Sequence, residues 1–198
     1  MSEQTEPVRP GRKRSQESRQ AILKAAFEIV AEQGYAALTV ERMAARSGVG
    51  KQTVYRWWPA KADVLLEALS LKADLFIPVP DLGEFVADLR TFLEATFKLA
   101  REPKVVAVLR SLMAEAQVDQ GFGERFRNSF LQSRREAFGQ ILERAESRGE
   151  LSARITPDLG VDLVFGILWY RLLADHRPLD DQLTDELVQL LGSPGPRY

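Results

Sequence analysis

The sequence predicts an all-α protein of about nine helices, in which a three-helix N-terminal unit precedes a larger helical bundle. Two observations lead to this prediction. Apolar residues recur at intervals of three and four in successive segments, and residues 82–198 contain no alternating strand pattern. Glycines and prolines separate those segments. We predict a flexible basic arm at residues 1–14, the three-helix unit at 15–61, the bundle at 62–192 and a tail at 193–198.

The composition narrows the chemistry that the chain can perform. Hydrophobic residues make up 45% of the 198 residues, which is enough for a packed core. No cysteine is present, so thiol catalysis, disulfides and thiolate metal sites are excluded. The single histidine, His176, excludes a multi-histidine metal site or a histidine-based triad within one chain. We therefore expect no metal and no cofactor. With neither a signal segment nor a membrane span in the sequence, the cytoplasm is the expected location, without a membrane partner.

Charge is distributed unevenly between the predicted units. Residues 1–61 contain 11 Lys and Arg against 6 Asp and Glu, a balance of +5, whereas residues 62–198 contain 16 against 22, a balance of −6. A basic module on an acidic body suits a protein of which one end meets phosphates. In the arm, Arg9, Arg12, Lys13 and Arg14 could follow phosphates or enter a minor groove, and a solvated tail is the alternative.

The first two helices of the N-terminal unit carry end signals. A helix is predicted at Ser15–Gln33, with Gly34 at the C′ position. The next helix follows Thr39, its N-cap candidate, and ends at Gly48, because glycine adopts the left-handed conformation without a Cβ penalty. One stripe of this helix occupies positions i, i+3, i+4 and i+7, namely Val40, Met43, Ala44 and Ser47.

A third, short helix is predicted at Lys51–Trp58, between Gly50 as N-cap and Pro59 as stop. Its polar side chains cluster towards the N-terminus: Lys51, Gln52, Thr53, Tyr55 and Arg56. A recognition helix points this end into the major groove, where Arg can fork onto guanine and Gln onto adenine. The spacing predicts a helix-turn-helix, and an αα-corner with a solvated polar face is the alternative. One of Trp57 and Trp58 should be buried, and the sequence leaves open which.

The helix predicted at 62–76 leads directly out of the N-terminal unit, which makes it the natural lever between the two parts. The bundle helices are predicted at 82–101, 104–118, 124–147, 157–174 and 180–191. Gly121-Phe122-Gly123 is predicted to be a break between helices. Thr156 and Pro157 suit the N-cap and N1 positions of the helix that follows them.

The helix at 157–174 is apolar on almost every side. Such a helix needs cover on more than one face, and the last helix offers a further leucine face. Two such helices from each of two chains predict a four-helix homodimer interface. Its expected residues are Leu163, Ile167, Leu168, Leu183, Leu187 and Leu190. A monomer with an unusually apolar core helix is the alternative.

Residues 18–69 resemble the DNA-binding domain of TetR-family transcriptional regulators. The resemblance rests on Leu-Thr-Val before the second helix, then Ala-x-x-Ser-Gly-Val-Gly, Thr-Val-Tyr-Arg and Pro-x-Lys. Two departures, Gly50 in place of the usual Ser and the Trp57–Trp58 pair, leave open which bases are contacted. The resemblance implies phosphate contacts from Thr39, Tyr55 and Lys61, none of which needs to read sequence. The C-terminal region more loosely resembles one TetR subgroup.

The same resemblance implies a homodimeric repressor that binds an inverted-repeat operator and is released by a small ligand. Expected ligand-binding side chains are aromatic, flexible or amide groups on the bundle helices: Phe92, Phe97, Met113, Gln117, Phe126, Phe130 and Trp169. They suit an apolar pocket with few polar anchors, and plain bundle core is the alternative for each. Tyr170 and Arg171 are polar groups for either a ligand or the dimer interface.

We therefore predict a non-enzymatic, sequence-specific DNA-binding transcriptional regulator. Its expected partners are a double-stranded operator, a small effector of unknown identity and a second copy of the chain. A transcriptional activator or a ligand-independent DNA-binding protein remains an alternative. A small helical enzyme or acyl-binding module has little support, because no nucleophile elbow, no Gly-rich phosphate loop and no informative carboxylate pair is present.

Overall fold

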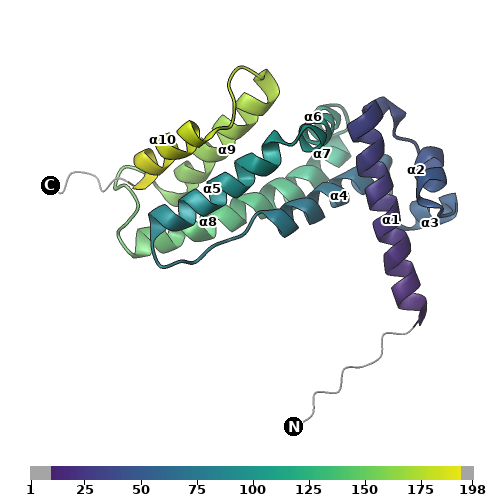
Figure 1. The fold of residues 1–198 in the computed structure, drawn as a ribbon, viewed down its shortest axis with the longest axis horizontal. Helices are drawn as coiled ribbons and strands as arrows, with labels where there is room; N and C mark the ends of the chain where they lie inside the picture. Colours follow the sequence, from purple (N-terminus) through teal and green to yellow (C-terminus); the bar gives the residue numbers. More distant parts are fainter. Residues whose placement is uncertain (1–9, 193–198) are drawn as a thin grey trace, which may run out of the picture.

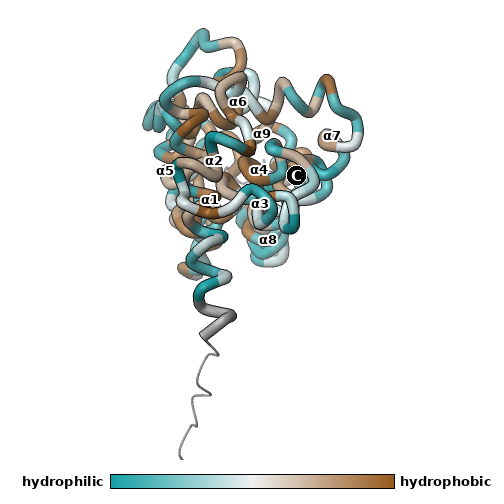
Figure 2. The backbone as a smooth tube through the Cα atoms, turned by 90° about the vertical axis from the view of Figure 1, so that its right-hand side faces the viewer, coloured by the Kyte–Doolittle hydropathy of each residue, from teal (hydrophilic) through white to brown (hydrophobic). Residues whose placement is uncertain are grey.

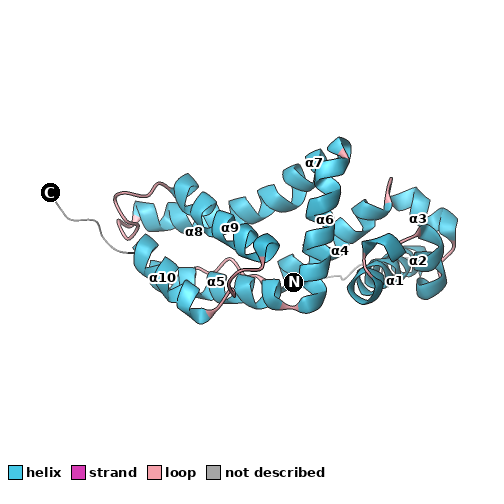
Figure 3. Ribbon diagram, turned by 90° about the horizontal axis from the view of Figure 1, so that it is seen from above, coloured by secondary structure: helices cyan, strands magenta, loops and turns pink. Residues whose placement is uncertain are grey.

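The computed structural model describes residues 10–192, and these are helical with no strand among them (Figure 1 and Figure 3). The elements are α1 (Pro10–Gln33), a 3-10 turn (Tyr35–Ala37), α2 (Val40–Ser47), α3 (Lys51–Trp57), α4 (Lys61–Phe76), α5 (Phe85–Arg101), α6 (Pro103–Val118), α7 (Gln120–Phe126), α8 (Gln132–Ser147), α9 (Pro157–Ala174) and α10 (Asp181–Gly192). A π-helical segment, Arg127–Leu131, joins α7 to α8 without a break. The all-α prediction is confirmed.

The helices form an elongated body with the N-terminal unit at one end (Figure 1). Helices α1, α2 and α3 form this end, and α5, α8, α9 and α10 form the other, with α4, α6 and α7 between them. Buried apolar side chains form one continuous core that extends from Ile22 in α1 to Leu191 in α10. Viewed along the body, α1 projects from one side (Figure 2).

The predicted helix ends are confirmed where a cap was identified. Thr39 Oγ1 accepts a hydrogen bond from the Arg42 backbone N–H at 3.2 Å, and Gly48 has a left-handed φ of 68°. Thr156 Oγ1 accepts from the Leu159 N–H at 3.3 Å and caps α9. These local bonds satisfy backbone groups that a helix end leaves unpaired, which is why the sequence alone could locate them.

Helix α1 begins at Pro10, five residues before the predicted start at Ser15. Proline suits the first helical turn, and arginine and lysine extend an existing helix without needing a partner surface. Low apolar content was therefore a poor guide to the end of this helix. Of the basic residues assigned to the arm, Arg9 lies outside the described residues.

The predicted break at Gly121–Gly123 is wrong, because both glycines lie inside α7. The helix begins where the Asp119 carboxylate accepts a hydrogen bond from the Phe122 N–H at 2.9 Å. Gly123 is needed for a different reason than a break. A Cβ at this position would lie 2.6 Å from the Ala116 carbonyl oxygen, so the missing side chain lets α7 approach the end of α6.

This contact predicts opposite effects for two neighbouring substitutions. Gly123→Ala is expected to lower the free energy of unfolding by about 1–3 kcal/mol, since backbone must move to make room. Gly121→Ala is expected to raise it by about 0.4–1 kcal/mol, because a Cβ there would meet nothing closer than 3.5 Å. Urea denaturation of both variants measures the difference. Equal effects would show that α6 and α7 do not depend on this close approach.

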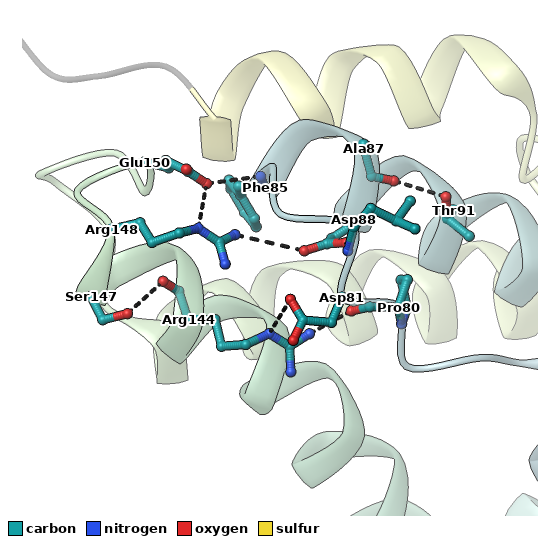
Figure 4. A network of polar contacts seen from close by, with 11 residues as sticks. Pro80, Asp81, Phe85, Ala87, Asp88, Thr91, Arg144, Ser147, Arg148 and Glu150 are labelled. Carbon is teal, nitrogen blue, oxygen red and sulfur yellow. Dashed lines mark hydrogen bonds and ion pairs between the residues drawn. The ribbon is translucent and has the colours of Figure 1, made fainter.

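The connection from α4 to α5, residues 77–84, is held against the end of α8 by a polar network (Figure 4). Asp88 is fully buried, and its Oδ1 accepts from the Leu82 N–H at 2.7 Å. Its Oδ2 lies 3.6 Å from Arg148 Nη2, and Arg148 Nε lies 3.0 Å from Glu150 Oε2. The chain that leaves α4 is thus attached to the bundle.

Candidate DNA-binding surface and effector cavity

The structure brings the predicted recognition side chains together on one face of α3. Its opposite face packs into the core through Val54, which is buried. Lys51, Gln52, Tyr55 and Arg56 are exposed, and Thr53 is half-buried. The outward face of α3 is therefore almost entirely polar or cationic, as a helix that enters a major groove requires.

The predicted phosphate contacts flank this face. Thr39 is exposed at the start of α2, and Lys61 is half-buried at the start of α4. Lys61 Nζ lies 4.4 Å from the centroid of the Tyr35 ring, a cation–π distance. Burial raises the pKa of the Tyr35 phenol, and the carboxylate of Glu115 raises it further, so the ring stays neutral beneath the lysine.

Two other arginines of the N-terminal unit serve its packing. The Arg46 guanidinium bridges α2 to α1, with Nη1 2.7 Å from Glu32 Oε2. Arg19 makes a two-bond contact with Glu67 on α4, with both bonds 2.7 Å long. The pair between Lys51 and Glu41 is different because both side chains are well exposed. Such surface pairs contribute little to stability, so the pair with Glu41 does not hold the Lys51 side chain firmly.

The structure answers which of the two adjacent tryptophans is buried. Trp58 is 5% exposed, and its Nε1–H donates to Glu67 Oε2 at 2.8 Å. Trp57 is half-buried, and the Arg56 guanidinium lies 5.3 Å from its ring centroid. The choice depends on Glu67, a long-range partner on α4 that the local pattern around the tryptophans does not reveal.

The bundle encloses a cavity of about 350 Å³. Its wall comes from α4, α5, α6, α8, α9 and the π-helical segment, and it is almost wholly apolar. Three of the predicted ligand-binding residues, Phe92, Phe130 and Trp169, line it. A volume of this size lies at the lower end of the range for small-molecule sites.

The other four predicted pocket residues do not line the cavity. Phe97 and Phe126 are buried in the bundle core, Met113 is half-buried and Gln117 is exposed. Helix α6 presents Val105 and Leu109 to the cavity, so positions one and two turns further along lie past its end. Residue type could not separate wall from core, because both favour aromatic and apolar side chains.

Sequence analysis missed the polar groups of the cavity. Thr96 is 5% exposed, and its Oγ1 has no hydrogen-bond partner among the described residues. Arg134 forms an ion pair with Asp74 of α4, and Arg135 Nη1 lies 2.6 Å from Asp162 Oδ1 of α9. Adjacent arginines in the charged helix α8 gave no signal of their own, because such residues usually face solvent.

A chain of side-chain contacts links the cavity to the start of α4. The rings of Phe122, Phe126 and Phe130 stack along α7 and the π-helical segment, with centroids 6.1 and 5.7 Å apart. Arg125 lies between Phe122 and Phe126 in the sequence, and its Nε is 2.7 Å from Asp63 Oδ1. This hydrogen bond raises the pKa of Arg125. Asp63 lies two residues after Lys61, so this ion pair attaches α7 next to the candidate DNA-binding surface.

The predicted dimer residues fall into two groups. Leu168, Leu183 and Leu187 are buried within the single chain, so these three belong to the core of one protomer. Leu168 faces the cavity from α9, whereas Leu183 and Leu187 lie on α10, which packs on α5. Leu163 and Ile167 are half-buried and Leu190 is exposed. The free face of α9 is a stripe at intervals of four and three residues, here called the α9 stripe: Leu159, Leu163, Gly166, Tyr170 and Leu173.

A short polar helix exposed beyond a tight turn, on a three-helix unit, defines a helix-turn-helix DNA-binding protein. Residues 22–68 match the family described as bacterial regulatory proteins, tetR family. Residues 79–191 match the tetracyclin repressor-like C-terminal domain. The chain belongs to the TetR family of transcriptional regulators.

Individual relatives agree with this assignment. The uncharacterized HTH-type transcriptional regulator YdeS of Bacillus subtilis is 34% identical, over 90% of this chain and 89% of the relative. The crystal structure of the TetR family transcription regulator SCO0332 has a TM-score of 0.75 and 31% identity, covering 87% of this chain and 95% of that one. FadR of Bacillus subtilis, in complex with stearoyl-CoA, shares the fold, with a TM-score of 0.70 and 22% identity over 88% and 97% of the two chains.

Residues 10–192 hold no group of three or more side chains placed to bind a metal ion. No helix in this range is long and apolar enough to cross a membrane.

Proposed function

We propose that the chain is a homodimeric repressor, which binds an inverted-repeat operator and is released by a small, largely apolar effector. One observation carries the proposal. Helix α4 contributes Lys61 to the DNA-binding surface, and its second half contributes Leu69 and Ala73 to the cavity wall, followed by Ile77 at the C-cap. An effector that moves α4 therefore acts on both sites, and the coupling between them is reciprocal.

The contacts with DNA divide by chemistry. Lys51, Gln52, Thr53 and Arg56 would meet base edges in the major groove. Thr39, Tyr55 and Lys61 would bond phosphate oxygens and fix the register of α3. In a two-fold dimer the two α3 helices would enter grooves about 34–36 Å apart, or somewhat more, on one face of the duplex.

The dimer interface in this proposal is the α9 stripe, with Leu190 of α10 beside it. Exposed apolar groups at helical spacing along a whole helix are typical of a surface that a second subunit covers. The cavity supplies an effector site, and the stearoyl-CoA complex of the FadR relative is consistent with an apolar ligand. The proposal assigns the protein no catalytic role, and it places the protein in the cytoplasm with bacterial DNA.

A fluorescence-anisotropy titration at two salt concentrations tests the proposal. The labelled duplex is the region upstream of the gene for this protein, and an unrelated duplex is the control. We expect saturable binding to the upstream region, and weak binding with a strong salt dependence to the control. Equal weak binding to both duplexes would contradict the assignment of this region as the operator.

Gln52→Ala is expected to relax the base preference at one position of each half-site. A bidentate contact to adenine is worth about 1–3 kcal/mol of discrimination, which the alanine cannot supply. Competition with duplexes substituted at each position measures the preference. If affinity falls and every preference remains, Gln52 does not contact a base.

Lys61→Ala is expected to weaken binding to operator and unrelated DNA by the same factor, because phosphates carry no sequence information. Loss of one phosphate contact should also lower the slope of log affinity against log salt by about 1. The same titrations give the slope. An unchanged slope would show that Lys61 binds no phosphate and that its role is its contact with Tyr35.

A further inference from the structure

We infer that the effector has an anionic head group, a carboxylate or a phosphate, which binds the Arg134 guanidinium in competition with Asp74. The inference rests on the proposed function of the cavity as the effector site. It adds the chemical class of the ligand, which is an apolar body with an acidic end. It also gives a reason why ligand binding changes a contact of α4.

The cavity has the chemistry for such a ligand. Its wall is apolar, but it includes two polar groups that are nearly buried, Thr96 and Arg134. The Thr96 hydroxyl has no partner among the described residues, and a buried polar atom without a partner costs free energy. A ligand with a polar end would remove that cost, whereas a pure hydrocarbon would not.

Arg134 is prepared to bind an anion. Its side chain is only 12% exposed, so its charge needs compensation within the protein. Both of its hydrogen bonds within residues 10–192, to Asp74 and to Ser133 Oγ, use the single nitrogen Nη2. The Nε and Nη1 donors are left for an acceptor. A guanidinium binds carboxylate or phosphate best through two parallel N–H bonds, and each of these two donors is parallel only to an Nη2 N–H, so a two-bond contact also needs the nitrogen that Asp74 occupies.

Asp74 makes the binding competitive. It lies on α4, and its carboxylate is the counter-ion of Arg134 on α8. A ligand anion on the same guanidinium would share that charge and repel the Asp74 carboxylate. Binding would therefore weaken a contact that fixes α4 to α8, close to Ala73 and Ile77 of the cavity wall.

The neighbouring arginine provides a matched control. Arg135 also lines the cavity and pairs with Asp162 of α9, but both of these side chains are far more exposed than Arg134. The partner carboxylates are similarly exposed, Asp74 at 59% and Asp162 at 64%, so the two arginines differ mainly in their own burial. A charge on an exposed arginine is screened by water and contributes less to anion binding than one on a nearly buried arginine. Replacing either arginine by glutamine removes one positive charge from the same turn of α8.

Isothermal titration calorimetry of the full chain without DNA tests the inference, with decanoate, decanoyl-CoA and uncharged decan-1-ol as probes. We expect at least one anionic probe to bind roughly tenfold or more tightly than the alcohol. Arg134→Gln should weaken the binding of that anionic probe by roughly tenfold to a hundredfold and leave the affinity for the alcohol unchanged. Asp74→Asn should strengthen the anionic probe, while Arg135→Gln should have a much smaller effect.

The outcomes separate the two anion sources and the two proposals. If Arg134→Gln lowers the affinity for decanoate most, the head group that Arg134 binds is a carboxylate. If it lowers the affinity for decanoyl-CoA most, that head group is a phosphate. The inference is wrong if the alcohol binds as tightly as both anions. It is also wrong if Arg134→Gln and Arg135→Gln lower the affinity for the anionic probe by the same factor. A purely structural Arg134 would lower the melting temperature without changing this selectivity. Failure to bind any operator in the separate DNA titration would contradict the proposed function alone.

Discussion

A Leu159→Glu, Tyr170→Glu variant is expected to be monomeric and to bind an inverted-repeat operator about 10²–10⁴-fold more weakly than the wild-type chain. Both positions belong to the α9 stripe, eleven residues apart, so they lie three turns apart on one face. Four carboxylates in a two-fold interface would have to be desolvated together, which the interface cannot compensate. A monomer then contacts one half-site and loses the effective concentration that tethers the second α3.

Sedimentation velocity gives the oligomeric state, and anisotropy with whole and half operators gives the two affinities. We expect the variant and the wild-type chain to bind a half-site alike, because α3 is unchanged. Val118→Glu is the control, since Val118 is 86% exposed at the end of α6 and outside the stripe. A double variant that stays dimeric would place the interface on another surface.

Leu168→Glu would be a poor test of the same interface. Leu168 is buried within one protomer and lines the cavity, so a carboxylate there would unfold the chain or fill the effector site. The sequence predicted that α9 is covered on two sides but could not assign its faces. An all-apolar helix has no polar side to show its orientation, and the assignment depends on how α6 and α8 pack on α9.

The parts of the fold that depend on near neighbours along the chain were predictable. The Thr39 cap, the Gly48 stop and the exposed face of α3 each follow from residues within two turns of one another. Gly123 shows the limit of that approach. A glycine can mark a break or a close helix contact, and only the position of the Ala116 carbonyl decides which.

The cavity was harder to predict because its lining comes from five helices and a π-helical segment. Phe92 lines it while Phe97, five residues later on the same helix, packs into the core. Arg134 and Thr96 are significant only because other helices bury them. A π-helical turn often marks a functional site in a long helix, and here it contributes Phe130 and Leu131 to the cavity wall.

Phe138→Ala is expected to lower the free energy of unfolding by about 3–5 kcal/mol, the usual cost of removing a large side chain from a well-packed core. Phe138 is fully buried behind the cavity wall. Its ring stacks on Phe92 with centroids 4.9 Å apart, and it meets the edge of Phe165 at 6.2 Å. Both partners line the cavity, so the substitution also removes the support of the effector site.

Guanidinium denaturation at matched protomer concentration measures the loss, because dimerisation makes apparent stability depend on concentration. Phe76→Ala is the control. It deletes the same side chain at an exposed position at the end of α4, and we expect a change within about 0.5 kcal/mol. Equal losses would mean that Phe138 is not part of a rigid wall. If the Phe92 and Phe165 rings relax into the space of Phe138, the cavity grows. Decanoate should then bind the Phe138→Ala variant more weakly, because packing contacts are lost. The preference for decanoate over decan-1-ol should remain, because Arg134 is unchanged.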